Sequence, residues 1–216
     1  MKTLTAISLF SGTGMLDRGV GAALKAQDYD LRTILYCERE TYAQEVLKAR
    51  MQDKLLCEAP IWSDVTTLDA SQLRGHVDCI IAGFPCQPFS VAGKRAGIED
   101  ERYLFGDVLR ITNEAGAALL FLENVPGLLS AKSDTTAPIA DVMRLLDEAG
   151  FDATWQCHTA EEAGAPHKRE RWFCIAWRRE LADSECDGQT GTKIEGITHC
   201  VSAEESTGQN ILPYAA

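Results

Sequence analysis

The chain has 216 residues, of which 45% are hydrophobic and 25% charged, and its formal net charge at pH 7 is −11. This length and composition suit one globular domain with a sizeable core, and no apolar run is long enough to span a membrane. The acidic balance argues against a generic nucleic-acid-binding module, because such modules usually carry a basic surface.

Apolar runs alternate with helix-length amphipathic segments along the first 178 residues. Strands are expected at 4–10, 32–37, 61–65, 77–83, 117–125, 151–160 and 171–177, and helices at 15–26, 38–51, 103–116 and 137–150. This alternation predicts an α/β fold with a doubly wound, mainly parallel sheet. Ligands of such sheets bind beyond the carboxyl ends of the strands. Residues 1–178 are therefore expected to form one domain.

Residues 179–216 differ in composition from the rest of the chain. They hold seven acidic and two basic residues, so they supply −5 of the net charge, and they are rich in Ser, Thr, Gly and Glu. No hydrophobic periodicity accompanies this composition. We expect an extended or disordered acidic tail.

The eight cysteines give no sign of a metal site or a disulfide framework. They contain no C-x-x-C pair, and Cys37, Cys79 and Cys174 lie in apolar strand-like runs, where a cysteine usually fills the core. The N-terminal run MKTLTAISLF leads into SGTGM rather than into a cleavage site, so we expect a strand there and no secretion signal. A reducing cytoplasm, without membrane association, is the expected location.

The stretch FSGTG (10–14) follows the first predicted strand and opens a helix. Its glycines would let the backbone approach a ligand, although a tight strand-to-helix turn is the simpler interpretation of this stretch alone. Asp17 stands where the last glycine of a G-x-G-x-x-G fingerprint would be. Glu38 ends the second strand, where an acid can bind ribose hydroxyls, and Asp64 could accept from an adenine amino group. Three such strand ends predict an adenosine-containing cofactor.

In GFPCQPFS (83–90), Cys86 lies between two prolines directly after a predicted strand. A rigidly held thiol at a strand end is a candidate nucleophile. Redox sensing is the competing interpretation, although no resolving cysteine lies close by in the sequence.

Two further stretches carry charged residues to predicted strand ends. Glu123 and Asn124 end an apolar strand, so the Glu123 carboxyl could stay protonated and donate to a ring nitrogen, or it could be a salt-bridged acid. Asn124 could satisfy backbone groups in the turn. In HKRERW (167–172), Arg169 and Arg171 are two apart, which would point both guanidinium groups to one face of a strand. The alternative is a charged, exposed strand edge.

Taken together and in this order, these motifs resemble the cytosine-5 DNA methyltransferase family over roughly residues 4–177. FSGTG resembles the cofactor loop and GFPCQPFS the catalytic loop. The other matching stretches are ERYLF (101–105), ENV (123–125) and GAPHKRERWF (164–173). The resemblance implies a Rossmann-like fold, S-adenosylmethionine as methyl donor, and a cytosine that is flipped out of double-stranded DNA.

The resemblance also implies roles for individual residues. Cys86 would attack carbon 6, Glu123 would hold ring nitrogen 3, and Arg171 with Arg169 would bind the ring oxygen and hold the loop. The implied cofactor-binding residues are Phe10, Ser11, Gly12, Thr13, Gly14, Met15, Glu38, Arg39, Asp64, Val65, Pro85 and Leu104. The implied DNA-binding residues are Gln87, Ser90, Lys94 and Arg95.

The sequence departs from the family pattern at three places. Met15 replaces a frequent glycine, and His167 replaces the usual glutamine before the arginines. No target-recognition domain and no Gly-Asn-containing segment of the cofactor site is recognisable. The leading hypothesis is that the chain is the catalytic domain of a bacterial or phage methyltransferase. If a second polypeptide recognises the DNA sequence, the chain would be one half of a split enzyme. The alternatives are an inactive remnant or regulatory partner, and a nucleotide-dependent oxidoreductase or thiol redox protein.

Overall fold

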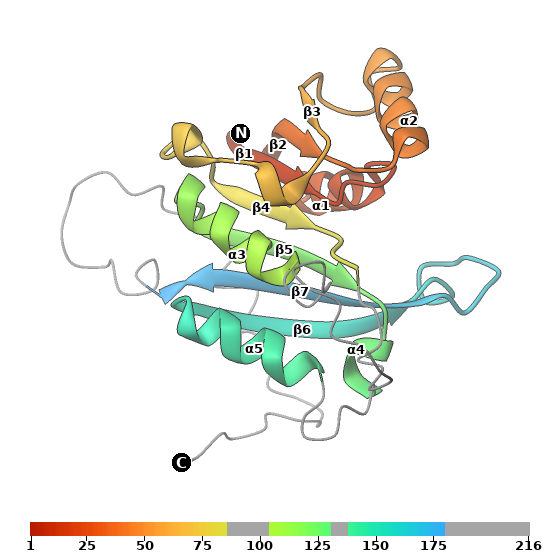
Figure 1. Cartoon of the computed structure of the whole chain (residues 1–216). Helices are drawn as coiled ribbons and strands as arrows, with labels where there is room; N and C mark the ends of the chain where they lie inside the picture. The colour runs from red at the N-terminus through yellow and green to blue at the C-terminus, as the bar shows by residue number, and fades with distance from the viewer. Residues whose placement is uncertain (86–103, 131–137, 180–216) are drawn as a thin grey trace, which may run out of the picture.

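A seven-stranded sheet with helices on both faces forms the centre of the molecule (Figure 1). The computed structural model describes residues 1–85, 104–130 and 138–179. Within them the strand order is β3-β2-β1-β4-β5-β7-β6. The first five strands run parallel, and β7 lies antiparallel between β5 and β6. The predicted α/β fold with a mainly parallel, doubly wound sheet is confirmed, while the predicted acidic tail lies almost entirely outside the described residues.

The seven expected strands and four expected helices are all present. The strands are β1 (Lys2–Leu9), β2 (Tyr29–Cys37), β3 (Ile61–Trp62), β4 (Cys79–Ala82), β5 (Leu119–Asn124), β6 (Phe151–Thr159) and β7 (Glu170–Arg178). The helices are α1 (Met15–Lys25), α2 (Thr41–Gln52), α3 (Leu104–Ala115), α4 (Gly127–Ser130) and α5 (Pro138–Glu148), with the 3₁₀ turns η1 (Val65–Thr67) and η2 (Ser71–Leu73). The short elements α4, η1 and η2 were not predicted.

Two predicted boundaries are wrong for reasons that the structure shows. The third strand ends at Trp62 rather than at residue 65, because the Asp64 carboxylate accepts from the Thr66 amide and turns the chain into η1. The second helix begins at Thr41 rather than at residue 38, because both carboxylate oxygens of Glu38 are used at the end of β2. Both boundaries are therefore set by acidic side chains that bind nearby amides.

Burial on both faces explains why the central strands read as continuous apolar runs. All four residues of β4 are buried, as are the last four of β1. Helix α1 covers one face with Val20 and Leu24, and α3 and α5 cover the other. Helix α2 packs Leu47 and Met51 on Tyr36. None of the helices in the described ranges is long and apolar enough to cross a membrane.

The strand order places a topological switch point between β1 and β4. From β1 the sheet grows toward β2 and β3 on one side, and toward β4 and β5 on the other. Loops that leave the carboxyl ends of the two strands at such a point diverge and leave room for ligands. Phe10 follows β1 and Gly83 follows β4, so FSGTG and GFPCQPFS both begin at the switch point.

Candidate active site

The FSGTG loop has a backbone that favours glycine. Phe10, Gly12 and Gly14 have φ values of 52°, 52° and 75°, in the left-handed region. A Cβ on Gly14 would lie 2.5 Å from Leu56 Cδ1, so this position also lacks space for a side chain. Gly14 is the N-cap of α1, and no described side chain caps the helix there. The first amides of α1 are therefore left to hydrogen-bond a ligand.

Glu38 shapes this loop from the end of β2. Its Oε2 accepts from the Gly12 amide at 2.6 Å, and its Oε1 accepts from the Glu40 amide at 2.8 Å. Arg50 of α2 donates from Nη1 to the Thr13 carbonyl on the other side of the loop. Each carboxylate oxygen keeps a second lone pair, so Glu38 can hold the loop and still accept from a ribose hydroxyl.

Asp64 lies at the neighbouring strand end. The Glu38 amide donates to the Trp62 carbonyl at 2.9 Å, which pins the end of β3 beside the end of β2. Hydrogen bonds from Thr66 to the Asp64 carboxylate hold the pKa of Asp64 below its usual value. The structure thus brings the FSGTG loop, Glu38 and the Asp64 turn to adjacent strand ends, with an ionised carboxylate on the turn.

These residues fit an adenosine-containing methyl donor. Among the described residues, no heavy atom lies within 4 Å of a Cβ built on Gly12, so the backbone there is open to a ligand. Carboxylates at strand ends, such as those of Glu38 and Asp64, can accept hydrogen bonds from ribose hydroxyls or an adenine amino group. Met15 is 56% exposed at the start of α1, directly after the FSGTG loop.

The segment that leads to Cys86 is anchored by Asn124. Its Nδ2 donates to the Phe84 carbonyl at 3.0 Å and its Oδ1 accepts from the Val125 amide at 2.8 Å, with only 3% of the residue exposed. Phe84 also packs on Phe105 of α3, with ring centroids 5.0 Å apart. The expected satisfaction of backbone groups by Asn124 is observed, and one of those groups belongs to the stem of the cysteine loop.

Five predicted site residues lie outside the described residues, beyond exposed Pro85. They are Cys86, Gln87, Ser90, Lys94 and Arg95. Leu104 is described again at the start of α3, where it packs on the main core cluster. The structure therefore fixes both ends of the predicted catalytic loop.

Glu123 forms an ion pair with Arg171 across β5 and β7. The Arg171 Nε and Glu123 Oε1 atoms are 2.8 Å apart, and the two side chains are 24% and 26% exposed respectively. Of the two interpretations of Glu123, the salt-bridged acid is the one observed. A Cβ on Gly83 would lie 3.5 Å from Glu123 Oε2 and 3.7 Å from the Phe10 carbonyl. Gly83 is thus the point where the ends of β1, β4 and β5 meet.

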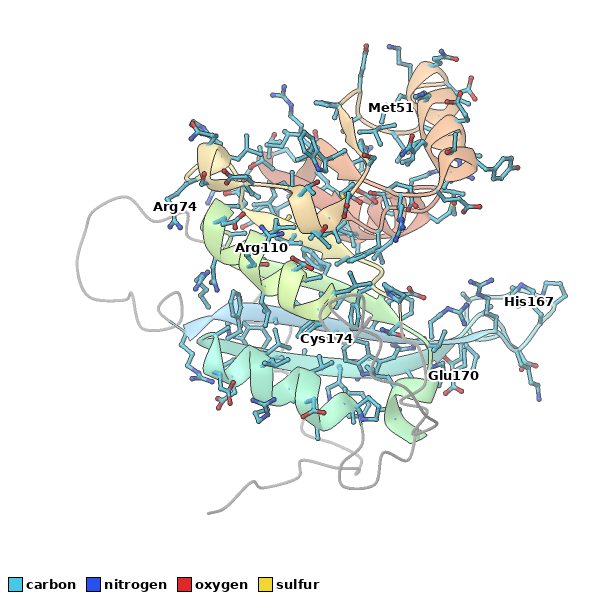
Figure 2. The ribbon with its side chains drawn as sticks, viewed as in Figure 1. Met51, Arg74, Arg110, His167, Glu170 and Cys174 are labelled. Carbon is cyan, nitrogen blue, oxygen red and sulfur yellow. The ribbon has the colours of Figure 1, made fainter. Side chains whose placement is uncertain are left out.

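Arg169 does not join this ion pair. Strand β7 begins at Glu170, so the alternation expected to align Arg169 with Arg171 does not reach Arg169. Arg169 is exposed and makes no side-chain hydrogen bond or ion pair with the described residues. It lies in the loop that connects β6 and β7, directly before β7. This loop projects beyond the sheet and carries His167 (Figure 2).

Burial confirms the structural interpretation of three cysteines. Cys37, Cys79 and Cys174 are at most 3% exposed, and burial raises the pKa of each thiol, to about 12 for Cys37 and Cys174. Such thiols are poor nucleophiles at neutral pH. In the described part of the chain, no three His, Cys, Asp or Glu residues are grouped so that they could hold a metal ion.

Asp17 is a functional candidate that the sequence interpretation missed. It is 3% exposed in the first turn of α1, and its carboxyl accepts from Ser8 Oγ of β1 at 2.8 Å and from Thr33 Oγ1 of β2 at 3.1 Å. Asp17 therefore fixes the start of α1, directly after the FSGTG loop, to two strands. The helical spacing of Asp17 with buried Val20 and Leu24 was the available signal.

Asp17 should make the folded chain less stable as the pH rises from about 4 to 6. Burial raises the pKa of Asp17 from 3.8 to about 6, so the folded state keeps a proton that the unfolded chain has released. The stability present at low pH is then lost by roughly 3 kcal/mol as pH passes the folded pKa. Asp17→Asn should remove this loss and raise the melting temperature at pH 8 by about 5–10 °C.

Thermal unfolding of the wild-type chain and Asp17→Asn across pH 4–8 measures this effect. Asp30→Asn, at an exposed position of β2, is the matched control and should follow the wild-type curve. Parallel curves for wild type and Asp17→Asn would contradict the prediction.

Comparison with known proteins identifies the family and the fold. The family model for C-5 cytosine-specific DNA methylase matches residues 4–209. The type II methyltransferase M.NgoBV of Neisseria gonorrhoeae is 31% identical over 213 residues, covering 96% of this chain and 49% of its own. M.CviJI of Paramecium bursaria Chlorella virus IL3A is 37% identical over 153 residues, covering 70% and 39%.

Solved structures agree on the fold. DNMT2 of Spodoptera frugiperda superposes with a TM-score of 0.63 at 22% identity, over 86% of this chain and 54% of that one. Dnmt2 of S. pombe superposes with a TM-score of 0.59 at 20% identity, over 95% and 57%. The chain spans about half the length of the curated relatives it matches, or less. Since the family model covers nearly the whole chain, the protein belongs to the C-5 cytosine-specific DNA methylase family.

Proposed function

We propose that the protein transfers a methyl group from S-adenosylmethionine to carbon 5 of cytosine in double-stranded DNA. The observation that carries this proposal is the meeting of three strand ends at Gly83. There the FSGTG loop, the stem of Cys86 and the Glu123–Arg171 pair approach one another within a few ångströms. The site therefore has a place for a methyl donor beside a place for a base.

The residues of this chain would each act at a defined atom of the flipped cytosine. The Cys86 thiolate attacks carbon 6, and the electron pair of the 5,6 double bond becomes available at carbon 5. Glu123, whose carboxylate pairs with Arg171 in the structure, takes up a proton from water, hydrogen-bonds ring nitrogen 3 and delivers the proton there, which offsets the negative charge that the attack creates. Arg171 holds the Glu123 carboxyl in position and is directed to the ring oxygen.

S-adenosylmethionine, when bound, supplies an electrophilic methyl group. Glu38, Asp64 and the amides at the start of α1 would hold it so that carbon 5 lies in reach. A water molecule then takes the carbon 5 proton, the bond between carbon 6 and the Cys86 sulfur breaks, the double bond is restored, and ring nitrogen 3 returns its proton to Glu123. No redox change occurs, which distinguishes this proposal from the oxidoreductase alternative.

We further propose that DNA recognition depends on a second polypeptide. The net charge of −11 supports this, because an acidic chain is a poor match for the phosphates of DNA. Relatives from bacteria support a cytoplasmic role in a bacterial cell.

Incubating the full chain with methyl-tritiated S-adenosylmethionine tests the proposal in two steps. Equilibrium dialysis should show saturable binding of one molecule per chain. Mixed-sequence duplex DNA should then become labelled, and the label should be recovered as 5-methylcytosine. Binding without transfer would favour the dependence on a second polypeptide, and absence of both would contradict the proposed function.

A further inference from the structure

Arg110, on the second turn of α3, reaches out of its own helix to a different part of the site. Its Nη1 donates to the Leu68 carbonyl at 2.8 Å and its Nη2 donates to the Val65 carbonyl at 2.9 Å. These carbonyls belong to η1 and the residue after it, more than 40 positions earlier in the chain. Figure 2 shows Arg110 on the side of α3 that faces this segment.

Two acids of α3 hold the guanidinium in this position. Asp107 accepts at 2.9 Å and Glu114 at 2.8 Å, one turn before and one turn after Arg110. The second carboxylate oxygen of Glu114 accepts from the Ala70 amide at 3.0 Å. Since a guanidinium is planar and always charged, bonds in four directions fix its orientation as well as its position.

The segment so held begins directly after Asp64. Asp64 accepts from Thr66 and starts η1, while the Thr67 and Leu68 amides close the turn on Asp64 and Val65 carbonyls at 3.2 and 3.4 Å. These two closing bonds are long, so they hold the turn only weakly. Side-chain bonds from Thr66 and Thr67 to Asp64, at 2.7 and 3.0 Å, also hold the turn locally, and the bonds from Arg110 tie it to α3.

We propose that Arg110 is a positioning residue for the cofactor, which it serves by fixing the 64–68 turn. This inference rests on the proposed function, because Asp64 is taken there to help hold the methyl donor. Helix α3 begins at Leu104, the residue that follows the undescribed end of the catalytic loop. The same helix thus holds the 64–68 turn and begins where the described residues resume after the catalytic loop.

Arg144 of α5 provides a matched control. It has an aspartate three residues before and a glutamate four residues after, at the same spacing as Arg110, with ion pairs of 3.6 Å to Asp141 and 2.7 Å to Glu148. No hydrogen bond from Arg144 to a backbone carbonyl is found among the described residues. Substituting Arg144 therefore removes an equivalent helix ion-pair triad without touching the turn.

The test compares Arg110→Met, Arg110→Lys and Arg144→Met in the full chain. Dissociation constants for S-adenosylmethionine are measured by equilibrium dialysis, and exchange of the Thr67 and Leu68 amides is measured by hydrogen–deuterium exchange. Arg110→Met should weaken binding at least tenfold and speed exchange at these amides at least tenfold. Arg144→Met should stay within twofold of wild type in both, and Arg110→Lys should be intermediate, since lysine offers a point charge in place of a fork.

Each outcome decides the proposal. Equal binding by Arg110→Met and Arg144→Met would overturn it, as would unchanged exchange at the turn. If the wild-type chain itself does not bind S-adenosylmethionine, the proposed function fails at its cofactor. In that case exchange alone judges the positioning role: faster exchange confined to Arg110 variants supports it, and equal exchange in all variants overturns it.

Discussion

Replacing Cys86 with serine is expected to abolish methyl transfer, with a fall in rate of roughly 10⁴-fold or more. A free cysteine has a pKa of about 8.5, so a useful fraction is thiolate at neutral pH, whereas a serine hydroxyl is almost never ionised. Cofactor binding should be unchanged, because the residues proposed to hold the methyl donor are those of the FSGTG loop, Glu38 and the Asp64 turn. The loss is thus expected in the rate of transfer alone.

A duplex that contains 5-fluorocytosine isolates the step in which Cys86 acts. After attack at carbon 6 and methylation, carbon 5 carries fluorine in place of the proton that must leave. Fluorine does not leave as a cation, so the bond between Cys86 and carbon 6 persists. The wild-type chain, with its DNA-reading partner if one is needed, should give a band of protein joined to DNA on a denaturing gel, and Cys86→Ser should give none.

Cys157 supplies the control for general effects of losing a thiol. It lies half-buried on β6, where burial raises the pKa of its thiol. Cys157→Ser should form the adduct like wild type. An adduct with Cys86→Ser, or its loss in Cys157→Ser, would refute the assignment of the nucleophile.

Strand-end positions in the site were predictable because they depend on local patterns. An apolar run bounded by turn residues marks the end of a buried strand, and parallel strands end at one edge of the sheet. The sequence alone therefore predicts that FSGTG, Glu38, Cys86 and Glu123 lie at one edge of the sheet. The observed meeting of Phe10, Gly83 and Glu123 follows from the same rule.

Contacts between distant polar side chains and the backbone were not predictable. Arg110 binds carbonyls 42 and 45 positions away, and Asn124 binds one 40 positions away. No periodicity encodes such pairs, because each depends on how two loops are placed by the packing of the elements between them. From the sequence alone, Arg110 would be predicted to be an exposed helix residue with acidic residues one turn before and one turn after it.

The position of β7 between β5 and β6 could also not be predicted, because no local sequence pattern indicates it. From the sequence, either strand of the predicted hairpin could pair with β5 at the edge of the sheet. The structure pairs Glu123 with Phe173 in this register, which places Arg171 beside Glu123 on the same face. The ion pair therefore follows from strand order, while the position of Arg169 outside the strand excludes it from that pair.

Exchanging Glu123 for glutamine is expected to slow methyl transfer by about 10²- to 10⁴-fold, the range typical for loss of an acid–base group. The amide keeps the shape of the side chain and can still offer a hydrogen bond to ring nitrogen 3. It cannot deliver a proton there, so negative charge created by attack at carbon 6 would stay on the ring. The amide also loses the ion pair that holds the side chain against Arg171.

Asp152→Asn is the matched control for this exchange. Asp152 of β6 also pairs with an arginine, Arg179, at 2.9 Å. Arg179 directly follows β7, at the opposite end of the β6–β7 hairpin from Arg171. Either substitution should change the free energy of unfolding by no more than about 1 kcal/mol, because both ion pairs are partly exposed. Only Glu123→Gln should lower the rate of methyl transfer at saturating cofactor, and neither should change the dissociation constant of S-adenosylmethionine more than twofold.

The trapping duplex separates the two roles that Glu123 could have. If Glu123 supports the attack, adduct formation with 5-fluorocytosine should slow by the same factor as methyl transfer, since charge develops at nitrogen 3 in that step. If it only holds Arg171, the adduct should form at nearly the wild-type rate. Because Glu123 Oε2 lies beside Gly83, three residues before Cys86, the geometry favours a role in the attack, and a normal adduct rate in Glu123→Gln would refute it.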